Sequence, residues 1–226
     1  MQFGASFIND ANRFFITDTT RTLYYIGKAT WIYSSSGSNP AMYRYRISST
    51  RRPVTFTYTS SGYAAVNNIF ESSANWWDIV LIAGGAVDLT IYCFNTVANT
   101  PSGYGMLVYD SSGTATFDSR NKPIRLKGIG TAAIGNVHSS VTSTPHGVSG
   151  LVKPAGFSVI SGHNALYQIV YPYVVTNIYA PTMEITTTSI NCGWRYLTYG
   201  SASVYPAVVY APLPWQIPII DGADYD

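Results

Sequence analysis

Apolar and polar residues alternate along much of the chain. In residues 52–62 (RPVTFTYTSSG), Val54, Phe56 and Tyr58 are separated by threonines. This period of two predicts a β-strand with one apolar face and one hydroxyl-bearing face. In residues 77–94 (WDIVLIAGGAVDLTIYCF), two apolar runs flank Gly84-Gly85, and paired glycines favour the tight turn of a hairpin.

Sequences rich in β-branched and aromatic residues recur at 166–175, 181–190, 194–200 and 203–211. Turn signals spaced by about 8–12 residues are typical of sandwiches and barrels. One short helix is predicted at residues 64–77. The pattern as a whole predicts an all-β fold, an antiparallel β-sandwich-like architecture with two β-rich halves, residues 1–100 and 101–211.

Two later segments break the alternation. Residues 128–156 are rich in glycine, serine and threonine and have no sustained period, so they are predicted to form loops with one or two short strands. Residues 212–226 carry prolines among apolar residues, including Pro214, Trp215 and Ile217. Because proline cannot donate to a ladder, these residues are predicted to form an extended arm rather than a central strand. We expect the arm to dock on its own domain or on a neighbour and to leave its acidic tip loose.

Residues 104–123 (YGMLVYDSSGTATFDSRNKP) predict a hairpin with a polar, glycine-bearing turn. Residues 3–18 (FGASFINDANRFFITD) align with this segment without a gap after a shift of 101 positions. Asn12 and Gly113 stand at turn positions that favour a positive φ angle. The two segments are either an internal repeat or two hairpins that share turn chemistry.

The composition indicates an unusual surface. Charged residues make up 11% of the chain, which contains 19 Tyr and 5 Trp, whereas typical soluble domains are about 25% charged. Such a surface is solvated by hydroxyl groups or covered by other protein, and tyrosine and tryptophan favour protein–protein interfaces. The net charge of +2 is too small to indicate nucleic acid as a partner. Two basic clusters are interpreted as solvated or intersubunit faces rather than phosphate sites: Arg44, Arg46, Arg51 and Arg52, and Arg120, Lys122, Arg125 and Lys127.

Features of membrane targeting are not found in the sequence. The N-terminal residues lack the basic and apolar regions of a signal peptide, and no apolar run approaches the ~18 residues of a membrane span. We therefore expect no membrane span and synthesis in a cytoplasm. Cys93 and Cys192 lie in apolar, strand-like sequence, where buried free thiols are the usual outcome and a long-range disulfide is the alternative.

No motif indicates catalysis, and we expect a protein that is not an enzyme and has no cofactor. The spacing of His138, His146 and His163 matches no zinc signature, so no metal is expected. The sequence HGVSG at 146–150 lacks the spacing of a nucleophile elbow, and GIGTAAIG at 128–135 lacks the lysine of a phosphate loop.

Carboxylate pairs, which glycosidases need, have two candidate positions. Asp110 and Asp118 could face each other across the hairpin, although aspartates in turns are normally structural. Asp78, Asp88 and Glu71, which lie near Trp76-Trp77 in the sequence, form the better cluster.

Residues 104–119 resemble small tail-tip and tail-fibre-associated structural proteins of long-tailed bacteriophages. These proteins carry a hairpin motif of the form YG-x-x-V-Y-D-x-x-G-x-x-x-F-D-S, which YGMLVYDSSGTATFDS matches closely and residues 3–18 match loosely. The resemblance covers only the two hairpins, and the first departs from the motif at Thr17-Asp18, where the acidic residue is shifted by one position.

The resemblance implies a structural virion component of a phage tail (tail tip, baseplate or fibre base), made in the host cytoplasm. Its implied partners are other copies of itself, with a trimer favoured, other tail proteins, and a host surface glycan or protein. The hairpin would be a docking module, because an edge strand can add to the sheet of a neighbour. The interface residues expected in the hairpin and the arm are Tyr104, Gly105, Val108, Tyr109, Gly113, Phe117, Pro214, Trp215 and Ile217.

The tryptophans support an alternative function. An aromatic face can stack on the apolar face of a pyranose ring, so the chain could be a carbohydrate-binding β-sandwich module for host receptor recognition. Trp76 and Trp77 are the residues predicted for that site. The opposing interpretation places the tryptophans in the core or in an interface.

Overall fold

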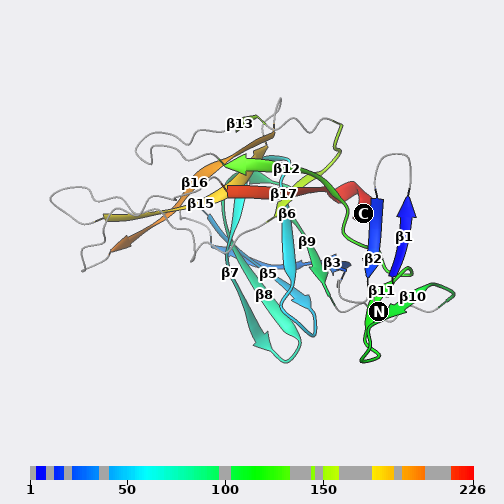
Figure 1. Cartoon of the computed structure of the whole chain (residues 1–226). Coiled ribbons are helices and arrows are strands. Elements are labelled where there is room, and N and C mark those ends of the chain that lie inside the picture. The colour runs from blue at the N-terminus through cyan, green and yellow to red at the C-terminus, as the bar shows by residue number, and fades with distance from the viewer. Residues whose placement is uncertain are drawn as a thin grey trace.

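The computed structural model consists almost entirely of antiparallel β-strands (Figure 1). It describes residues 4–8, 13–17, 22–35, 41–96, 103–132, 144–145, 150–157, 175–185, 190–201 and 215–226. Within these ranges the one helical element is the short 3₁₀ helix η2 (Gly222–Tyr225). The predicted all-β fold is confirmed, as expected for a chain in which period-two patterns and β-branched residues predominate.

The structure contains two large sheets and two separate two-stranded hairpins. The six-stranded sheet has the order β12 (Leu126–Ala132), β17 (Trp215–Asp221), β14 (Pro154–Phe157), β6 (Val54–Tyr58), β9 (Thr90–Asn95) and β3 (Tyr24–Lys28). The seven-stranded sheet has the order β13 (Thr144–Pro145), β16 (Ile190–Ser201), β15 (Val175–Ile185), β7 (Ser61–Ser73), β8 (Trp76–Val87), β5 (Ala41–Ser48) and β4 (Thr30–Ser35). The hairpins are β1 (Gly4–Ile8) with β2 (Arg13–Thr17), and β10 (Leu107–Tyr109) with β11 (Ala115–Asp118).

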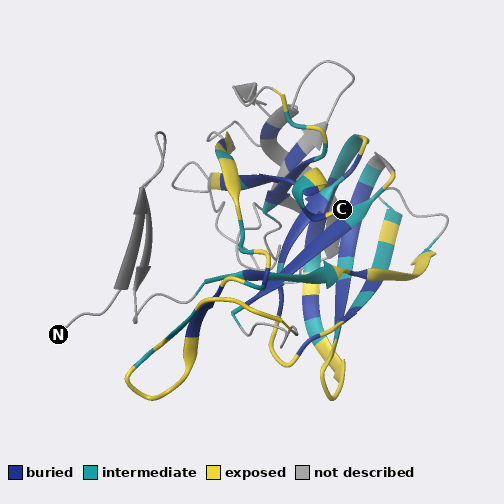
Figure 2. Cartoon of the chain, turned by 90° about the vertical axis from the view of Figure 1, so that its right-hand side faces the viewer, coloured by how far each residue is buried: buried dark blue, intermediate teal, exposed yellow. Residues whose placement is uncertain are grey.

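The main core lies between the two large sheets, where Figure 2 shows the buried residues gathered. One sheet contributes alternate residues of β5, β7 and β8, and the other contributes alternate residues of β9. The buried members of this core are Ala29, Tyr45, Ile47, Ala64, Val66, Ile69, Ile79, Leu81, Ala83, Ile91 and Cys93.

A second core covers the opposite face of the six-stranded sheet. It contains Phe56, Tyr92, Phe94, Ala155, Ile220 and Tyr225. On β9, Tyr92 and Phe94 therefore face one core while Ile91 and Cys93 face the other. β9 is therefore buried on both faces.

Residues 215–221 dock on their own domain, as expected, but they do so as an interior strand, which corrects the prediction of an extended arm rather than a central strand. β17 pairs with β12 on one side and with β14 on the other. Ile217, Ile219 and Ile220 are fully buried. The β14 ladder ends at Ile219, so Pro218 lies one residue beyond it, where that side needs no donor.

Residues 64–77 form β7 and the start of β8, so the predicted helix is wrong. The two strands pair along their length and turn at Asn75, whose φ angle is 64°. The predicted turn at Gly84-Gly85 is also displaced, because β8 runs through both glycines and the positive φ angle, 53°, falls at Asp88. A Cβ atom at Gly84 would lie 2.7 Å from Cε1 of Tyr63, so a larger residue there would have to displace the Tyr63 ring.

Both predicted hairpins are present, but their registers differ. Leu107 pairs with Asp118 in β10–β11. In the first hairpin, the residues 101 positions earlier are Ser6 and Thr17. These two are not partners, because Ser6 pairs with Phe15. The hairpins are therefore not geometric copies, which favours the interpretation that they share only turn chemistry.

Strands from both predicted halves are combined in each large sheet. β3, β6 and β9 from residues 1–100 share the six-stranded sheet with β12, β14 and β17. The seven-stranded sheet likewise joins β4, β5, β7 and β8 to β13, β15 and β16. The division predicted at residue 100 does not follow the sheets.

Candidate functional site

The turn of the β10–β11 hairpin is fixed by one aspartate. Asp110 Oδ1 accepts hydrogen bonds from the backbone N–H groups of Ser112 (2.9 Å) and Thr114 (2.8 Å). The N–H of Gly113 donates to the Asp110 carbonyl at 3.0 Å, and the φ angle of Gly113 is 80°. The predicted positive φ at Gly113 is confirmed, whereas Asn12 lies outside the described residues.

The base of the same hairpin is held by Asp118. The guanidinium of Arg120 donates to both carboxylate oxygens at 2.8 and 2.7 Å, and the Asp118 N–H donates to the Tyr24 hydroxyl at 2.6 Å. The hydrogen bonds from Arg120 lower the pKa of Asp118, against the opposing effect of burial. Asp110 and Asp118 thus act at opposite ends of the hairpin and form no carboxylate pair. A Cβ atom at Gly105 would lie 2.3 Å from Cγ of Arg120, so a larger residue there would have to displace the Arg120 side chain.

The residues predicted for the interface divide into exposed and buried groups. Tyr104 and Tyr109 are exposed, Tyr109 to 54%. Phe117 and Ile217 are buried within this chain, so they offer no surface to a partner and the expectation for them is corrected. Val108 is half-buried, while Gly105 and Gly113 are exposed. Pro214 and the side chain of Trp215 lie outside the described residues; the backbone of Trp215 pairs with Ala132.

A group of aromatic and charged side chains gathers on the outer face of the seven-stranded sheet, the face turned away from the main core. Alternate residues of β5 and β8 point into the core, namely Tyr45, Ile47, Ile79 and Leu81. The intervening residues therefore point outward. We call the outward set the aromatic–arginine face; it consists of Tyr33 on β4, Arg44 and Arg46 on β5, and Trp76 and Asp78 on β8.

Asp78 holds two arginines at the centre of this face. Its side chain is fully buried, and the cross-strand pairing places it directly beside Arg46. Arg46 donates from Nε (2.6 Å) and Nη2 (3.1 Å), and Arg44 donates from Nε (2.8 Å) and also contacts Asp78 through Nη2. The hydrogen bonds from Arg46 lower the pKa of Asp78 to about 2, with the help of Arg44 and against the effect of burial.

Aromatic rings flank the two arginines. The guanidinium carbon of Arg44 lies 5.8 Å from the centre of the Tyr33 ring and 5.3 Å from that of Phe70, within the range of cation–π attraction. Tyr33 is 45% exposed and Trp76 is 44% exposed. Trp77 differs: it packs against the main core and donates its indole N–H to the Ser49 carbonyl at 2.9 Å.

The predicted carboxylate cluster near the tryptophans is not assembled. Asp78 and Asp88 lie ten residues apart along β8 and the turn that follows it, a separation of roughly 30 Å in extended chain. Glu71 is paired with Trp77, and cross-strand partners share a face, so Glu71 lies on the core side of the sheet.

The ion pair of Asp78 predicts a specific acid sensitivity. A carboxyl group whose folded pKa is about 2 stabilises the fold fully above its ordinary pKa of about 3.9 and loses that contribution as the pH falls toward 2. Such a group contributes up to about 2.6 kcal/mol, and the partial exposure of both arginines reduces the expected figure to about 1–2 kcal/mol. Asp78→Asn should therefore be less stable at pH 7 and show a flatter loss of stability between about pH 4 and pH 2.

Denaturant unfolding of both proteins at pH 7, 4 and 2.5 measures this difference. Asp88→Asn is the matched control, because Asp88 is an exposed turn residue and should leave the pH profile unchanged. Identical pH profiles for Asp78→Asn and the parent chain would contradict the assignment.

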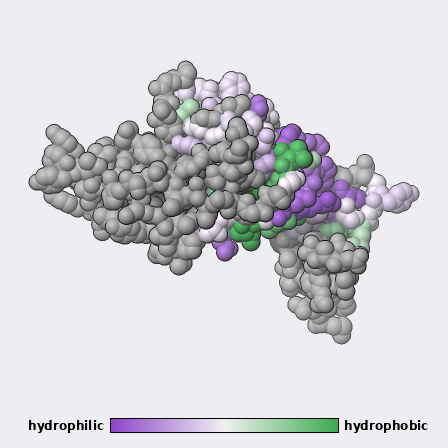
Figure 3. Space-filling view, turned by 90° about the horizontal axis from the view of Figure 1, so that it is seen from above, coloured by the Kyte–Doolittle hydropathy of each residue, from purple (hydrophilic) through white to green (hydrophobic). Residues whose placement is uncertain are grey.

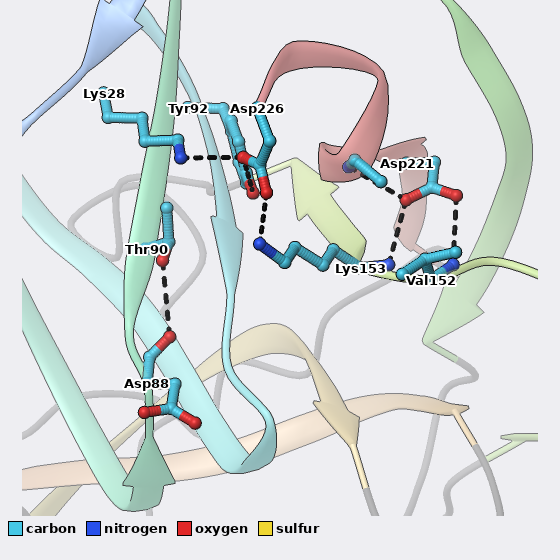
Figure 4. Close-up of polar contacts among 9 residues, drawn as sticks. Lys28, Asp88, Thr90, Tyr92, Val152, Lys153, Asp221 and Asp226 are labelled. Atoms are coloured by element: carbon cyan, nitrogen blue, oxygen red, sulfur yellow. Dashed lines mark hydrogen bonds and ion pairs between the residues drawn. The ribbon is translucent and has the colours of Figure 1, made fainter.

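The C-terminal residues form a second charged cluster (Figure 4). Asp226 accepts from Lys28 Nζ at 2.7 Å and from the Tyr92 hydroxyl at 3.1 Å, and it pairs with Lys153. Burial raises the pKa of Asp226, but hydrogen bonds from Lys153, Lys28 and Tyr92 outweigh it and lower the pKa to about 2. Asp221 accepts the backbone N–H groups of Val152 and Lys153 at 3.0 and 2.9 Å. This cluster anchors β17 and η2, so the acidic tip is held rather than loose.

Most of the second basic cluster is neutralised in the same way. Arg120 pairs with Asp118, and Lys127 pairs with Asp224 at 2.9 Å. Lys122 donates to the Asp224 carbonyl at 3.5 Å. These lysines and arginines therefore tie segments of the chain together.

Metal and thiol chemistry find little support in the described part of the chain. No group of three or more metal-ligating side chains occurs among the described residues, and the three histidines lie outside them. Cys93 and Cys192 are buried and free, which confirms the expectation of free thiols; burial raises the pKa of both.

Among the residues described, no helix is long and apolar enough to cross a membrane.

The sequence reasoning missed Tyr33, and it did not connect Arg44 and Arg46 with Trp76. The signal was present in MYRYRIS (residues 42–48), where two arginines alternate with residues that face the core. Their convergence on Asp78 depends on the β5–β8 register, which a local pattern does not specify.

Fold and site together define an antiparallel β-sandwich protein with an aromatic–arginine face on one sheet. Comparison with protein-family models, with curated proteins and with solved structures gives no match for this chain.

Proposed function

We propose that this chain is a non-enzymatic structural component of a bacteriophage tail, at the tail tip, baseplate or fibre base. It assembles through contacts with copies of itself, a trimer being favoured, and with other tail proteins, and it contributes to host attachment. The resemblance of residues 104–119 to phage tail proteins supports this class of protein. The observation that carries the proposal is the exposure of large apolar side chains at sheet edges.

These exposed residues lie on edge strands and on the β10–β11 hairpin. They are Trp31 and Ile32 on β4, Tyr104 and Tyr109 at the hairpin, and Leu126 and Ile129 on β12. Figure 3 shows one face on which apolar side chains lie beside hydrophilic ones. Edge strands of solitary proteins are usually protected by charges, prolines or bulges, and contiguous exposed apolar surface marks interaction sites.

β4 is the clearest case. It ends the seven-stranded sheet and pairs with β5 on one side. Its residues, TWIYSS, include no charge and no proline, and Trp31 is 56% exposed. One register shift interrupts its pairing with β5, between Trp31 and Tyr33. Such an edge favours strand addition by a neighbouring subunit.

Two measurements test the proposal. Mass spectrometry of purified phage particles should detect this chain in the virion. The chain itself is synthesised in the host cytoplasm. Tyr104→Ser with Tyr109→Ser should weaken self-association of the pure protein by about tenfold or more, because exposed tyrosines supply much of the contact energy of an interface. Sedimentation velocity measures the change.

The control replaces Val152, an exposed apolar residue outside the edges and the hairpin, by serine, which should leave association unchanged. Absence of the chain from purified particles, together with a monomer at every concentration, would contradict the proposal.

The second candidate function is carbohydrate binding for host receptor recognition. The exposed ring of Trp76, beside two arginines held by Asp78, is the observation that favours it. Trp77 is excluded from that site by its packing against the core.

A further inference from the structure

We propose that the aromatic–arginine face binds an acidic saccharide, a short glycan that carries a carboxylate, sulfate or phosphate group. This inference rests on the second candidate function, and it adds the chemical class of the ligand and the side chains that select it.

The arginine donors are fixed before any ligand arrives. Arg44 and Arg46 each direct Nε–H and one Nη2–H at Asp78. A guanidinium has five N–H donors, so each arginine keeps donors beyond those that face the carboxylate, and Arg44 is also hydrogen-bonded to Tyr33. The side chains of Arg44 and Arg46 are 26% and 36% exposed, whereas that of Asp78 is fully buried. Donors held in one orientation lose little entropy on binding, and paired N–H groups match an anionic oxygen pair.

The local charge favours an acidic ligand. Two guanidinium groups surround one carboxylate, which leaves one positive charge in excess. Asp78 and Glu71 are the only acidic residues in β4, β5, β7 and β8, and Glu71 lies on the core side of the sheet. No described carboxylate of these strands therefore opposes an anion on the outer face.

The rings flank the donors at a distance suited to a chain of sugars. Tyr33 pairs with Arg44 on the edge strand, and Trp76 pairs with Ser48, two residues beyond Arg46. Strand spacing and rise place the Cα atoms of Tyr33 and Trp76 roughly 16 Å apart, the length of a short oligosaccharide. The C–H face of a pyranose is attracted to the electron-rich face of an aromatic ring.

The order of these groups favours a saccharide over a protein partner. Protein interfaces place apolar residues at the centre and charges at the rim. On this face the charged donors of Arg44 and Arg46 lie between the exposed rings of Tyr33 and Trp76, and the apolar Val80 lies beside Arg44, with Met42 beyond it. An extended ligand that alternates polar edges with apolar faces fits it better.

An array of acidic and neutral glycans, probed with the labelled full chain, tests the inference. Acidic glycans should bind, and matched neutral forms, such as the methyl esters of the same uronic acid oligosaccharides, should bind at least about tenfold more weakly. Raising the salt concentration should weaken binding, because it screens the charges.

Two variants locate the site. Trp76→Ala removes an exposed ring, and Arg46→Lys keeps the charge but loses the paired donor geometry; each should weaken binding about tenfold. Val152→Ser is the control: it removes an exposed apolar side chain that lies outside the aromatic–arginine face and outside the sheet edges, and it should bind as the parent does. Thermal unfolding shows whether each variant is folded. The comparison of acidic with neutral glycans uses the parent chain alone, so it remains a valid test even if a variant fails to fold.

The outcomes separate the inference from the function on which it rests. Equal binding of neutral glycans, lost in Trp76→Ala, would overturn the acidic preference and keep the carbohydrate-binding function. Absence of binding to every glycan would overturn both. Binding that survives Trp76→Ala and Arg46→Lys, or an acidic peptide that competes as well as the glycans, would also overturn the inference.

Discussion

A chain that lacks residues 215–226 should fail to fold. β17 occupies an interior position in the six-stranded sheet, between β12 and β14, and its removal leaves two unpaired edges. It also removes the fully buried side chains of Ile217, Ile219 and Ile220. Full burial of one such side chain is worth about 1.5–3 kcal/mol, so the three together rival the total stability of about 5–15 kcal/mol of a typical domain. Circular dichroism and the dispersion of the amide NMR spectrum measure the result.

A shorter deletion provides the control. Removing residues 223–226 keeps β17 and takes away Tyr225 and Asp226, with the bonds to Lys28, Lys153 and Tyr92. This protein should fold with reduced stability. A native-like spectrum for the chain without residues 215–226 would show that the C-terminal strand is dispensable.

Phe94→Ala should destabilise the protein by about 3–5 kcal/mol. Phe94 is fully buried in the second core. Its ring meets Tyr225 edge to face, with centroids 5.1 Å apart and planes at 89°, and it meets Phe56 at 5.5 Å and 75°. The truncation leaves a cavity between β9 and η2 and removes three aromatic contacts, the third with Tyr25 at 5.8 Å, each worth about 0.5–1.5 kcal/mol beyond burial. Urea unfolding measures the loss.

Two further substitutions provide comparisons for the loss of stability expected of Phe94→Ala. Phe94→Leu fills part of the cavity and should cost less than Phe94→Ala. Tyr104→Ala removes a fully exposed ring and should change the stability by less than about 0.5 kcal/mol. A loss for Phe94→Ala as small as that for Tyr104→Ala would refute the second core.

The strands that sequence reasoning predicted best are those with unbroken alternation. Val54, Phe56 and Tyr58 alternate with threonines, and β6 forms there. Sequence reasoning failed where pairing overrides local preference. Residues 64–77 were predicted as a helix, but a long partner strand and the turn at Asn75 hold them extended. Pro218 argued against a central strand, and the early end of the β14 ladder made that position tolerant of proline.

Individual residues of the candidate site could be predicted from the sequence, but their arrangement in space could not. Trp76 was singled out as a sugar-stacking residue, and Arg44 and Arg46 were recognised as a basic cluster. Their common partner, Asp78, is more than thirty positions away in sequence. Only the β5–β8 register brings them together, and a slip of one residue would turn Asp78 toward the core.

The sequence by itself determined the all-β class, the strands with period-two alternation, the turn at Gly113 and a surface poor in charge, because these depend on local backbone preference and composition. The tertiary structure alone decided which strands become neighbours, that both faces of β9 are buried, that β17 is an interior strand, and that Asp78 meets two arginines between exposed rings. The physical reason is that strand pairing acts between distant segments, and its register is selected by the burial of whole faces and not by any short stretch of residues.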